Sequence, residues 1–313
     1  MDSKIDLNKK MDNGVTFLMR EAWAGNPEMV QFLIENGANI HEQDAYGFTA
    51  LHFAAFSRKD EKGADCIELL TQAGANINAV CYRGNTPLMY ATRAGNVECV
   101  KMLRLLNADF SIANKNGMTP LKTILWHIDE TLDNGMPCDK WAEFLLSQGA
   151  DINETNTNGD NLLLQLLFEG DDMPKTADFL LNNKMDINRQ NHEGLTPLMV
   201  SIINNNQNCF SKIMQKNVDL NLQNNRGVTA LMYAAMLKRQ DMIYALIDKK
   251  ADVKLQTQGG ETFWGYMSES MRRRFVEDYK LPRMAKYITS HELSNAMMER
   301  IIQENHQVLQ YKI

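Results

Sequence analysis

Apolar positions along most of this chain follow the period of an amphipathic helix. In residues 29–34, for example, apolar side chains recur at the spacing that places them on one face of a helix. Such stretches are short, and segments rich in Asn, Asp and Gly separate them. The pattern predicts units made of a helix, a short turn, a second helix and an extended hairpin loop.

A glycine-containing phrase recurs at a nearly constant interval. Its glycines are separated by 33, 37, 33, 42, 35, 33 and 33 residues. After the glycine, five units continue as Thr-Pro-Leu or Thr-Ala-Leu, and a second phrase such as Gly-Ala-Asn-Ile at residues 37–40 closes the first seven units. Two phrases in a fixed order indicate a tandem repeat. Its eight units open near Gly14, Gly47, Gly84, Gly117, Gly159, Gly194, Gly227 and Gly260.

Each part of the phrase has a physical role at a helix end. A threonine hydroxyl can accept a hydrogen bond from the free backbone N–H groups at a helix start. Proline at the first helical position loses no hydrogen bond, and its ring presets φ. Glycine after the second helix can adopt the left-handed conformation that ends it. The Asn and Asp residues that follow favour a turn over more helix.

The repeat strongly resembles the ankyrin-repeat family, over roughly residues 12–280. Its best unit is Tyr-Gly-Phe-Thr-Ala-Leu-His-Phe-Ala-Ala at residues 46–55. The resemblance implies an all-α ankyrin-repeat solenoid of about eight helix-turn-helix units with hairpin loops. We expect the solenoid to occupy residues 1–280, and residues 281–313 to form a C-terminal helical extension that caps it.

Several departures from the repeat give further expectations. The two longest spacings contain inserts near residues 57–65 and 129–140, between the helices of their units, where extra residues can bulge out at modest cost. The fifth unit has Asn161 and Leu162 in place of Thr-Pro, which predicts a weakly started first helix. In the eighth unit, the segment Arg272–Phe275 replaces an apolar stripe, as in a terminal cap whose outer face meets water.

The resemblance implies a binding surface on the inner face of the first helices and on the hairpin tips. One inner-face position, which we name the inner column, carries large side chains of types that are mostly enriched at binding hot spots. The inner column consists of Trp23, Phe56, Arg93, Trp126, Phe168, Ile203 and Met236. The hairpin tips would add polar contacts through Tyr46, Tyr82, Arg83, Lys115, His192 and Arg226.

A purely structural role remains open for each of these residues. Large apolar side chains are usually part of a core, so any member of the inner column could pack against a neighbouring helix or under an insert. A charged residue at a hairpin tip could simply be solvated. As a set, however, an exposed apolar stripe of this size is typical of a binding surface.

Charge and composition narrow the class of partner. The formal net charge is −6; residues 271–313 carry eight basic and five acidic side chains, which leaves −9 for residues 1–270. This excess of acidic residues argues against nucleic-acid binding, because nucleic-acid binding needs clustered Lys and Arg. The sequence has no run of eighteen apolar residues, so we expect no membrane insertion. Its N-terminus also lacks the apolar segment of a secretory signal. Five cysteines without metal-ligand spacing favour reduced thiols and a cytoplasmic protein.

The sequence offers no catalytic constellation. His52 occupies the histidine position of the family's Thr-Pro-Leu-His phrase, where the ring is expected to brace the turn. The other histidines lack metal-site spacing, and no nucleophile or phosphate-binding phrase occurs. Cys99 is expected to be a small buried hydrophobic residue. We therefore expect no enzymatic activity, no cofactor and no metal.

The leading interpretation is a monomeric, non-catalytic scaffold that binds a segment of another protein on its concave inner-helix and hairpin surface. A ubiquitin-ligase substrate adaptor is the alternative, because residues 281–288 loosely resemble the Leu-Pro stretch of ligase-docking boxes. The Asn- and Met-rich composition is also similar to that of secreted ankyrin effectors of intracellular bacteria, which would place the protein in a host cytosol. Hairpin asparagines such as Asn78, Asn153, Asn188 and Asn221 permit hydroxylation of the kind found in the family.

Overall fold

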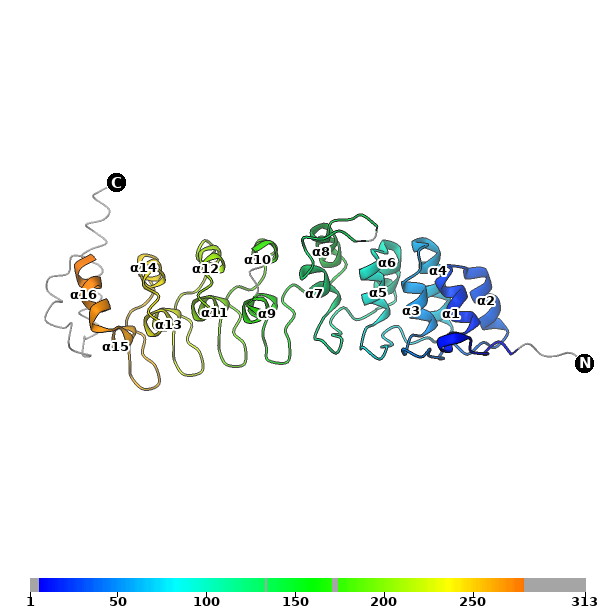
Figure 1. Cartoon of the computed structure of the whole chain (residues 1–313), viewed down its shortest axis with the longest axis horizontal. Helices are drawn as coiled ribbons and strands as arrows, with labels where there is room; N and C mark the ends of the chain where they lie inside the picture. Colours follow the sequence, from blue (N-terminus) through cyan, green and yellow to red (C-terminus); the bar gives the residue numbers. More distant parts are fainter. Residues whose placement is uncertain (1–5, 133, 171–173, 279–313) are drawn as a thin grey trace, which may run out of the picture. The chain divides into compact units, whose positions relative to one another are not determined.

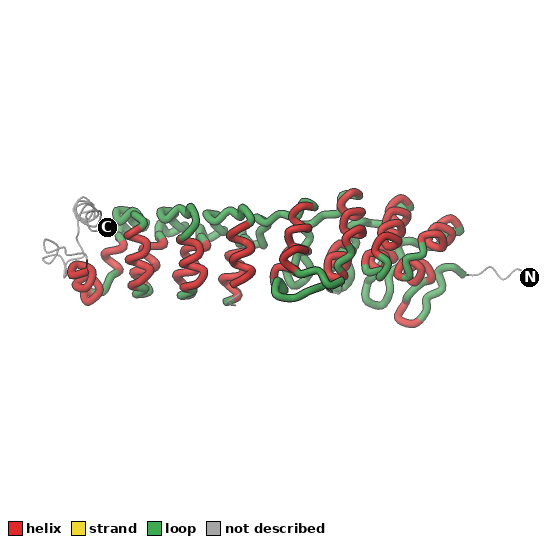
Figure 2. The backbone as a smooth tube through the Cα atoms, turned by 90° about the horizontal axis from the view of Figure 1, so that it is seen from above, coloured by secondary structure: helices red, strands yellow, loops and turns green. Residues whose placement is uncertain are grey.

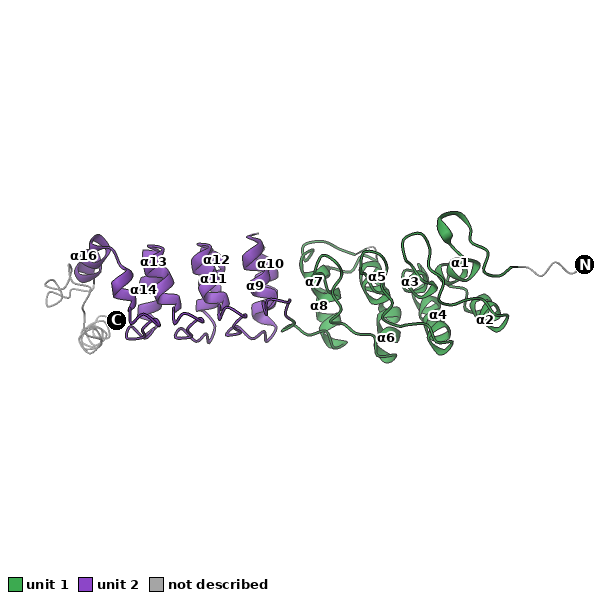
Figure 3. Ribbon diagram, turned by 90° about the horizontal axis from the view of Figure 1, so that it is seen from below, with its two compact units in different colours: residues 1–154 green, residues 155–313 purple. Residues whose placement is uncertain are grey.

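The computed structural model describes residues 6–132, 134–170 and 174–278. In this part of the chain all regular secondary structure is helical, and extended pairing is confined to two isolated bridges (Figure 2). The chain forms two compact units, residues 1–154 and residues 155–313 (Figure 3). The predicted all-α repeat fold is confirmed, whereas the boundary at residue 280 stays a prediction because it lies outside the described residues.

Each repeat begins with a short first helix (Figure 1). The first helices are α1 (Phe17–Trp23), α3 (Ala50–Ala55), α5 (Pro87–Ala94), α7 (Pro120–Leu125), α9 (Leu162–Glu169), α11 (Pro197–Ile203), α13 (Ala230–Met236) and α15 (Phe263–Tyr266). A turn of 3₁₀ helix, η1 (Asp12–Gly14), precedes α1. Within the first unit α1, α3, α5 and α7 contact one another in succession, and within the second unit α9, α11, α13 and α15 do the same.

A second helix completes each repeat and lies against the first. The second helices are α2 (Pro27–Glu35), α4 (Asp60–Gln72), α6 (Val97–Leu105), α8 (Cys138–Ser147), α10 (Pro174–Asn182), α12 (Gln207–Met214), α14 (Gln240–Asp248) and α16 (Glu269–Asp278). They stack among themselves as well, as α2, α4 and α6 do in the first unit. In the second unit, α9, α11 and α13 form one row, α10, α12 and α14 form another, and the hairpin loops project on the side of the first row (Figure 1).

The core lies between these two layers and repeats with the sequence. The third residue of the Thr-Pro-Leu phrase is at most 1% exposed in all eight repeats. These residues are Leu18, Leu51, Leu88, Leu121, Leu163, Leu198, Leu231 and Trp264. Each repeat buries its apolar face only by stacking on its neighbours, which is the physical basis of a solenoid.

In five repeats the threonine of the phrase caps the first helix as expected. Thr86 Oγ1, for example, accepts a hydrogen bond from the backbone N–H of Met89 at 3.3 Å. In the fifth repeat, Asn161 Oδ1 accepts the equivalent bond from Leu164 at 3.0 Å, and α9 extends over 8 residues. The expectation of a weakly started helix is therefore wrong, because asparagine is among the strongest N-cap residues.

Side-chain hydrogen bonds build the hairpin loops, and backbone hydrogen bonds join neighbouring loops within each compact unit. The Asp44 carboxylate accepts hydrogen bonds from the backbone N–H groups of Tyr46 and Phe48, both at 2.8 Å. Gly47 then adopts a φ of +82°, which favours glycine. The carbonyl oxygen of Tyr46 accepts a hydrogen bond from the N–H of Tyr82 in the following hairpin at 3.0 Å. Successive tips are thus held in register within the unit.

Hairpin asparagines form a second set of bonds between repeats. Asn78 Oδ1 accepts a hydrogen bond from the backbone N–H of Asp109 at 3.0 Å. The same bond, with a donor 31 residues further along, is formed by Asn8, Asn188 and Asn221. The side-chain oxygens of Asn78, Asn188 and Asn221 therefore already serve the fold, while hydroxylation of these residues stays untested.

The first insert does not bulge out as a loop. Its residues instead lengthen the second helix of the repeat, since α4 has 13 residues where α2 has 9. The Asp60 carboxylate, in the first turn of α4, accepts hydrogen bonds from the backbone N–H groups of Glu98 and Cys99, both at 3.0 Å. These donors belong to the first turn of α6, whose own Asn96 side chain donates to Ala55 and makes no cap. The bulge expectation is corrected: the insert caps the neighbouring helix.

The second insert is a loop between α7 and α8, as expected. It is closed by an isolated bridge between Thr131 and Pro137. Asn134 Nδ2 donates a hydrogen bond to the carbonyl oxygen of Gly95 at 2.7 Å, at the C-terminal end of α5. This insert, too, contacts the preceding repeat.

The eighth repeat differs from the expected charged cap at one residue. Arg273 and Arg274 are exposed and pair with Glu269 and Asp278 of the same helix. Arg272, however, is only 3% exposed, and its guanidinium donates to the carbonyl oxygens of Trp264 and Gly265. The expectation of a water-facing outer face thus fits Arg273 and Arg274 but not Arg272, because α15 is so short that its final carbonyl groups need a buried donor.

The predictions for the C-terminal extension fall outside the described residues. They concern the helical extension at residues 281–313 and the ligase-docking resemblance at residues 281–288. Both stay predictions.

Candidate functional site: the inner-helix and hairpin surface

In the first unit, the inner column lies at the C-terminal ends of the first helices. Trp23 is the last residue of α1, Phe56 follows α3 directly, and Arg93 lies in the last turn of α5. Trp23 and Phe56 are 47% and 43% exposed, and Arg93 is exposed as well. Trp126 directly follows α7 and is half-buried. Three of the four side chains are therefore accessible to a partner.

The second unit carries the rest of the inner column in the same local position. Phe168 lies in the last turn of α9, and Ile203 and Met236 are the last residues of α11 and α13. Phe168 and Met236 are 48% and 43% exposed, whereas Ile203 is half-buried. The structure thus gives each unit its own run of inner-column side chains, and whether a partner contacts either run stays a prediction.

Contacts within the fourth repeat explain why Trp126 is half-buried. The Lys122 ammonium lies 4.7 Å from the centroid of the Trp126 ring, in a cation–π contact. Lys122 itself is buried, and its backbone N–H donates to the Thr119 hydroxyl oxygen at 3.0 Å. The Thr119 hydroxyl donates in turn to Glu154 Oε1 at 2.5 Å. Burial of the Glu154 carboxyl raises its pKa to about 7. Trp126 therefore has a structural role whether or not it also binds a partner.

The hairpin-tip candidates are exposed, as a binding role requires. Tyr46 and Tyr82 are 58% and 60% exposed, and Arg83 is exposed next to Tyr82. The carbonyl oxygen of Arg83 accepts a hydrogen bond from the N–H of Lys115, so these tips belong to one ladder in the first unit. The remaining tip candidates are also exposed: Lys115, His192 and Arg226.

Tyr90 links the hairpins to the inner column, and sequence reasoning missed it. Its ring lies 5.1 Å from that of Phe48 and 6.1 Å from that of Phe56, both in edge-to-face geometry. Its hydroxyl oxygen accepts a hydrogen bond from Asn85 Nδ2 at 3.1 Å. Tyr90 precedes Arg93 by three residues and so lies one helical turn away on the same face. That spacing was the available sign that a second inner-face position also carries large side chains.

His52 braces the turn between repeats, as expected. Its Nδ1 accepts a hydrogen bond from the backbone N–H of Thr49 at 3.1 Å. The ring proton is thereby assigned to Nε2, which donates to the carbonyl oxygen of Asn85 at 3.1 Å. Burial lowers the pKa of His52 to about 4. The ring is therefore neutral near pH 7 and serves the fold.

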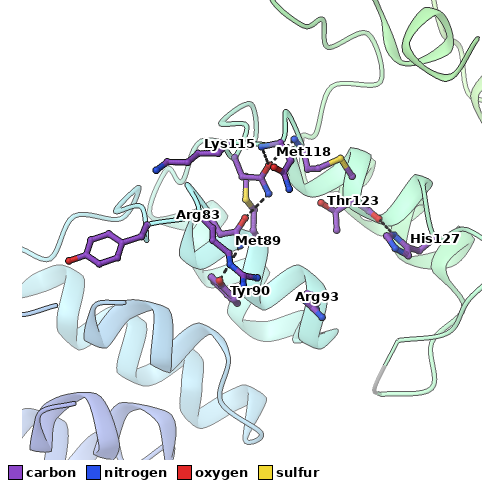
Figure 4. Close-up of a pocket in the computed structure, with 12 residues that line it drawn as sticks. Arg83, Met89, Tyr90, Arg93, Lys115, Met118, Thr123 and His127 are labelled. Atoms are coloured by element: carbon purple, nitrogen blue, oxygen red, sulfur yellow. Dashed lines mark hydrogen bonds between the residues drawn. The ribbon is translucent and has the colours of Figure 1, made fainter. Parts of the chain in front are cut away.

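A hollow of about 520 Å³ opens between the inner helices and hairpins of the third and fourth repeats. Its walls come from α5, α7 and the two hairpins that precede these helices (Figure 4). The basic side chains on its lining are Arg83, Arg93 and Lys115, with His127 at the α7 end. None of the described lining residues carries a carboxylate. The hollow is thus a locally cationic site in a chain of net charge −6.

The described residues contain no cluster of three or more His, Cys, Asp and Glu side chains that could hold a metal ion. All five cysteines are buried, and none of them is joined to another in a disulfide. Burial raises the pKa of the Cys66 thiol to about 12, and it raises that of Cys99 further. Cys99 is fully buried, as expected of a small hydrophobic residue. No described helix is long and apolar enough to span a bilayer.

Comparison with known families decides which kind of repeat this is. A model of ankyrin repeats in three copies matches residues 1–81, 18–114, 59–156, 132–224 and 163–257. The chain belongs to the ankyrin-repeat family. Ankyrin repeats generally mediate contacts between proteins, and the family typically serves as non-enzymatic scaffold.

Individual relatives match shorter stretches of the chain. The mouse protein named "Ankyrin repeat, SAM and basic leucine zipper domain-containing protein 1" is 38% identical over 101 residues, which are 32% of this chain and 21% of the relative. An ankyrin repeat protein of Rickettsia bellii is 33% identical over 116 residues, which are 36% of this chain and 62% of the relative. The chain therefore covers less than two thirds of the length of either relative.

Proposed function

We propose that this ankyrin-repeat protein is a non-catalytic interaction module that binds a segment of another protein on its inner-helix and hairpin surface. The observation that carries the proposal is the exposure of large side chains at the inner-column position, which recurs at the end of seven first helices. Trp23 and Phe56 leave close to half of their surface in water, and so does Phe168 in the second unit. Large aromatic side chains that are only partly covered are typical of interface hot spots.

The hairpins extend this surface in the first unit. The exposed rings of Tyr46 and Tyr82 lie on loops that are hydrogen-bonded to each other, so the loops present them in a fixed register. Tyr90 contacts Phe56 and connects the helix row to the hairpin row. A preorganised surface of aromatic side chains loses little conformational entropy when a partner binds. The five buried thiols form no disulfide with one another, which further supports a cytoplasmic location.

Matched alanine variants test the proposal. Affinity capture followed by binding measurements on each captured protein should show that Trp23→Ala with Phe56→Ala weakens at least one interaction by about tenfold or more, because truncated hot-spot residues commonly cost that much. Phe32→Ala is the control, since Phe32 is a similarly exposed aromatic residue on the second helix α2. Thermal unfolding of both variants should stay close to that of the parent protein.

Two outcomes would contradict the proposal. If the double variant unfolds while Phe32→Ala does not, Trp23 and Phe56 are core residues. If both proteins fold and every captured partner binds them as it binds the parent, the binding surface lies elsewhere on the repeats.

A further inference from the structure

The hollow between the third and fourth repeats is a charged feature that general scaffold function leaves unexplained. Arg83, Arg93 and Lys115 are exposed around it, and none of them forms an ion pair with a described residue. Four exposed cations elsewhere in the first unit do pair with carboxylates: Lys10, Arg20, Lys101 and Lys140. Residues 1–270 carry a formal charge of −9, so a carboxylate-free cluster of cations is unusual for this surface.

We propose that this hollow binds the carboxylate side chains of an acidic segment of a partner protein. The inference rests on the proposed function and adds to it the chemistry of the partner. Arg83 and Lys115 come from adjacent hairpins, whereas Arg93 comes from α5, so the hairpins and the inner helix both supply cations to the lining of the hollow (Figure 4). An anion in the hollow would interact with several cations at once. Arginine also presents a planar fork that matches a carboxylate in bidentate geometry.

Hydrogen bonds around the hollow order its walls. His127 Nδ1 lies 2.8 Å from the carbonyl oxygen of Thr123 and donates to it, which orients the ring. Asn114 Oδ1 accepts hydrogen bonds from the backbone N–H groups of Asn116 and Met118, at 2.9 and 3.1 Å, and so fixes the loop that carries Lys115. Lys115 therefore extends from a hairpin whose backbone is already ordered.

The second repeat, which precedes the hollow, indicates that the ligand also carries an apolar residue. Phe56 lies one repeat before Arg93 along the inner column, and Tyr90 contacts it at a ring distance of 6.1 Å. Neighbouring helices lie about 8–10 Å apart, and an extended peptide advances about 3.3 Å per residue. The favoured ligand is thus an extended segment in which an apolar residue and an acidic residue are separated by roughly three positions.

The test begins with selection of random displayed peptides on the full chain, followed by fluorescence anisotropy of an enriched peptide. We expect enrichment of Asp and Glu near an apolar residue. The peptide should bind Arg93→Glu with Lys115→Glu about tenfold or more weakly, because reversed charges repel the carboxylates. Replacing its acidic residues with Gln and Asn should weaken binding to the parent protein similarly. A rise from low to high salt should also weaken binding, since such charges are screened over about 10 Å at 0.1 M salt.

Arg189→Glu is the matched control. Arg189 is exposed on a hairpin of the second unit, so the change alters the net charge in the same direction without touching the hollow. Circular dichroism establishes that all variants fold. The control should bind the peptide as the parent does, and a loss equal to that of the double variant would overturn the proposal in favour of general charge attraction.

The remaining outcomes separate this inference from the proposed function. Enrichment of neutral or basic peptides that still depend on Trp23 and Phe56 would overturn the acidic ligand and leave the interaction module standing. A selection that enriches nothing would overturn both. Far tighter binding of peptides with phosphoserine in place of the acids would overturn the carboxylate assignment. The chain could also self-associate, and that association could disappear in Arg93→Glu with Lys115→Glu. This result would assign the hollow to a second copy of the chain and would overturn the proposed partner segment.

Discussion

The Nε2 atom of His52 donates a hydrogen bond to the carbonyl oxygen of Asn85, 33 residues later and 3.1 Å away. One imidazole ring thereby joins the first helix of the second repeat to the hairpin that begins the third. Four other repeats place a methionine at this position: Met19, Met89, Met199 and Met232. The sulfur atoms of Met19 and Met232 each accept a hydrogen bond from the threonine N–H of their own repeat, as His52 Nδ1 does. A thioether has no proton, however, so it cannot donate to the next hairpin.

His52 should therefore make stability depend on pH. Its pKa in the folded protein is lowered to about 4 from 6.5, so its contribution is fully present above pH 6.5 and is lost as the pH falls towards 4. The difference corresponds to about 3 kcal/mol at most. In His52→Met this slope should disappear, and at pH 7 the variant should be about 1 kcal/mol less stable because one hydrogen bond is gone. Urea unfolding at a series of pH values measures both effects, and an unchanged slope would contradict the assignment.

Glu154 should produce a slope of opposite sign. Burial raises its folded-state pKa from 4.5 to about 7, so the favourable contribution of its neutral form is fully present below pH 4.5 and is lost as the pH rises through 7. In Glu154→Gln, the new side chain has nearly the same shape as glutamate but no charge. The free energy of unfolding at pH 8 should therefore rise by about 2 kcal/mol. Tryptophan fluorescence suits this measurement, because three of the four tryptophans lie in residues 1–154. A variant less stable than the parent at pH 8 would show that the charged form serves the fold.

The Asp60 carboxylate should stabilise α6 from outside that helix. Asp60→Ala removes the acceptor for two N–H groups in the first turn of α6, and we expect a loss of about 1–2 kcal/mol. Hydrogen exchange of the Glu98 and Cys99 amides should accelerate. Asp65→Ala is the control, since Asp65 is exposed on the same helix and its removal alters the charge equally. Equal effects of the two changes would mean that the hydrogen bonds contribute nothing.

A comparison of Gly47→Ala with Gly117→Ala should distinguish backbone strain from steric crowding. Both glycines adopt a positive φ, +82° and +70°, so alanine at either position is strained by about 1 kcal/mol. At Gly47, a Cβ atom would also lie 2.7 Å from the Tyr82 ring and 2.9 Å from the Tyr82 backbone nitrogen, whereas nothing lies within 4 Å at Gly117. Gly47→Ala should therefore lower the free energy of unfolding by at least twice as much as Gly117→Ala. Similar losses would show that the hairpin at Tyr82 moves aside freely.

The repeat fold could be predicted from the sequence because its determinants are local and recur. Thr86 and Asn161 cap helices that begin three residues or fewer away, and both side chains act within their own repeat. The error at Asn161 arose from treating a departure from the family phrase as a weakness, although asparagine forms the same bond. The inner column was predicted by applying the family resemblance position by position, but the degree of exposure of Trp126 depends on its contact with Lys122.

Contacts between repeats could not be predicted in the same way. The role of Asp60 depends on donors 38 and 39 residues away, and the burial of Arg272 depends on how early α15 ends. The cationic hollow likewise combines Arg93 with Lys115, which no single phrase connects. Such features follow from the stacking of neighbouring repeats, and a periodic pattern only shows that neighbours exist.

The cap that Asp60 provides limits how freely individual repeats of this array could be exchanged. Because α6 depends on a carboxylate supplied by the preceding repeat, moving the third repeat elsewhere in the array would leave two of its backbone donors unsatisfied. A generic second repeat without the extra helical turn would have the same effect. The second and third repeats should therefore be inherited, truncated and engineered as one inseparable pair.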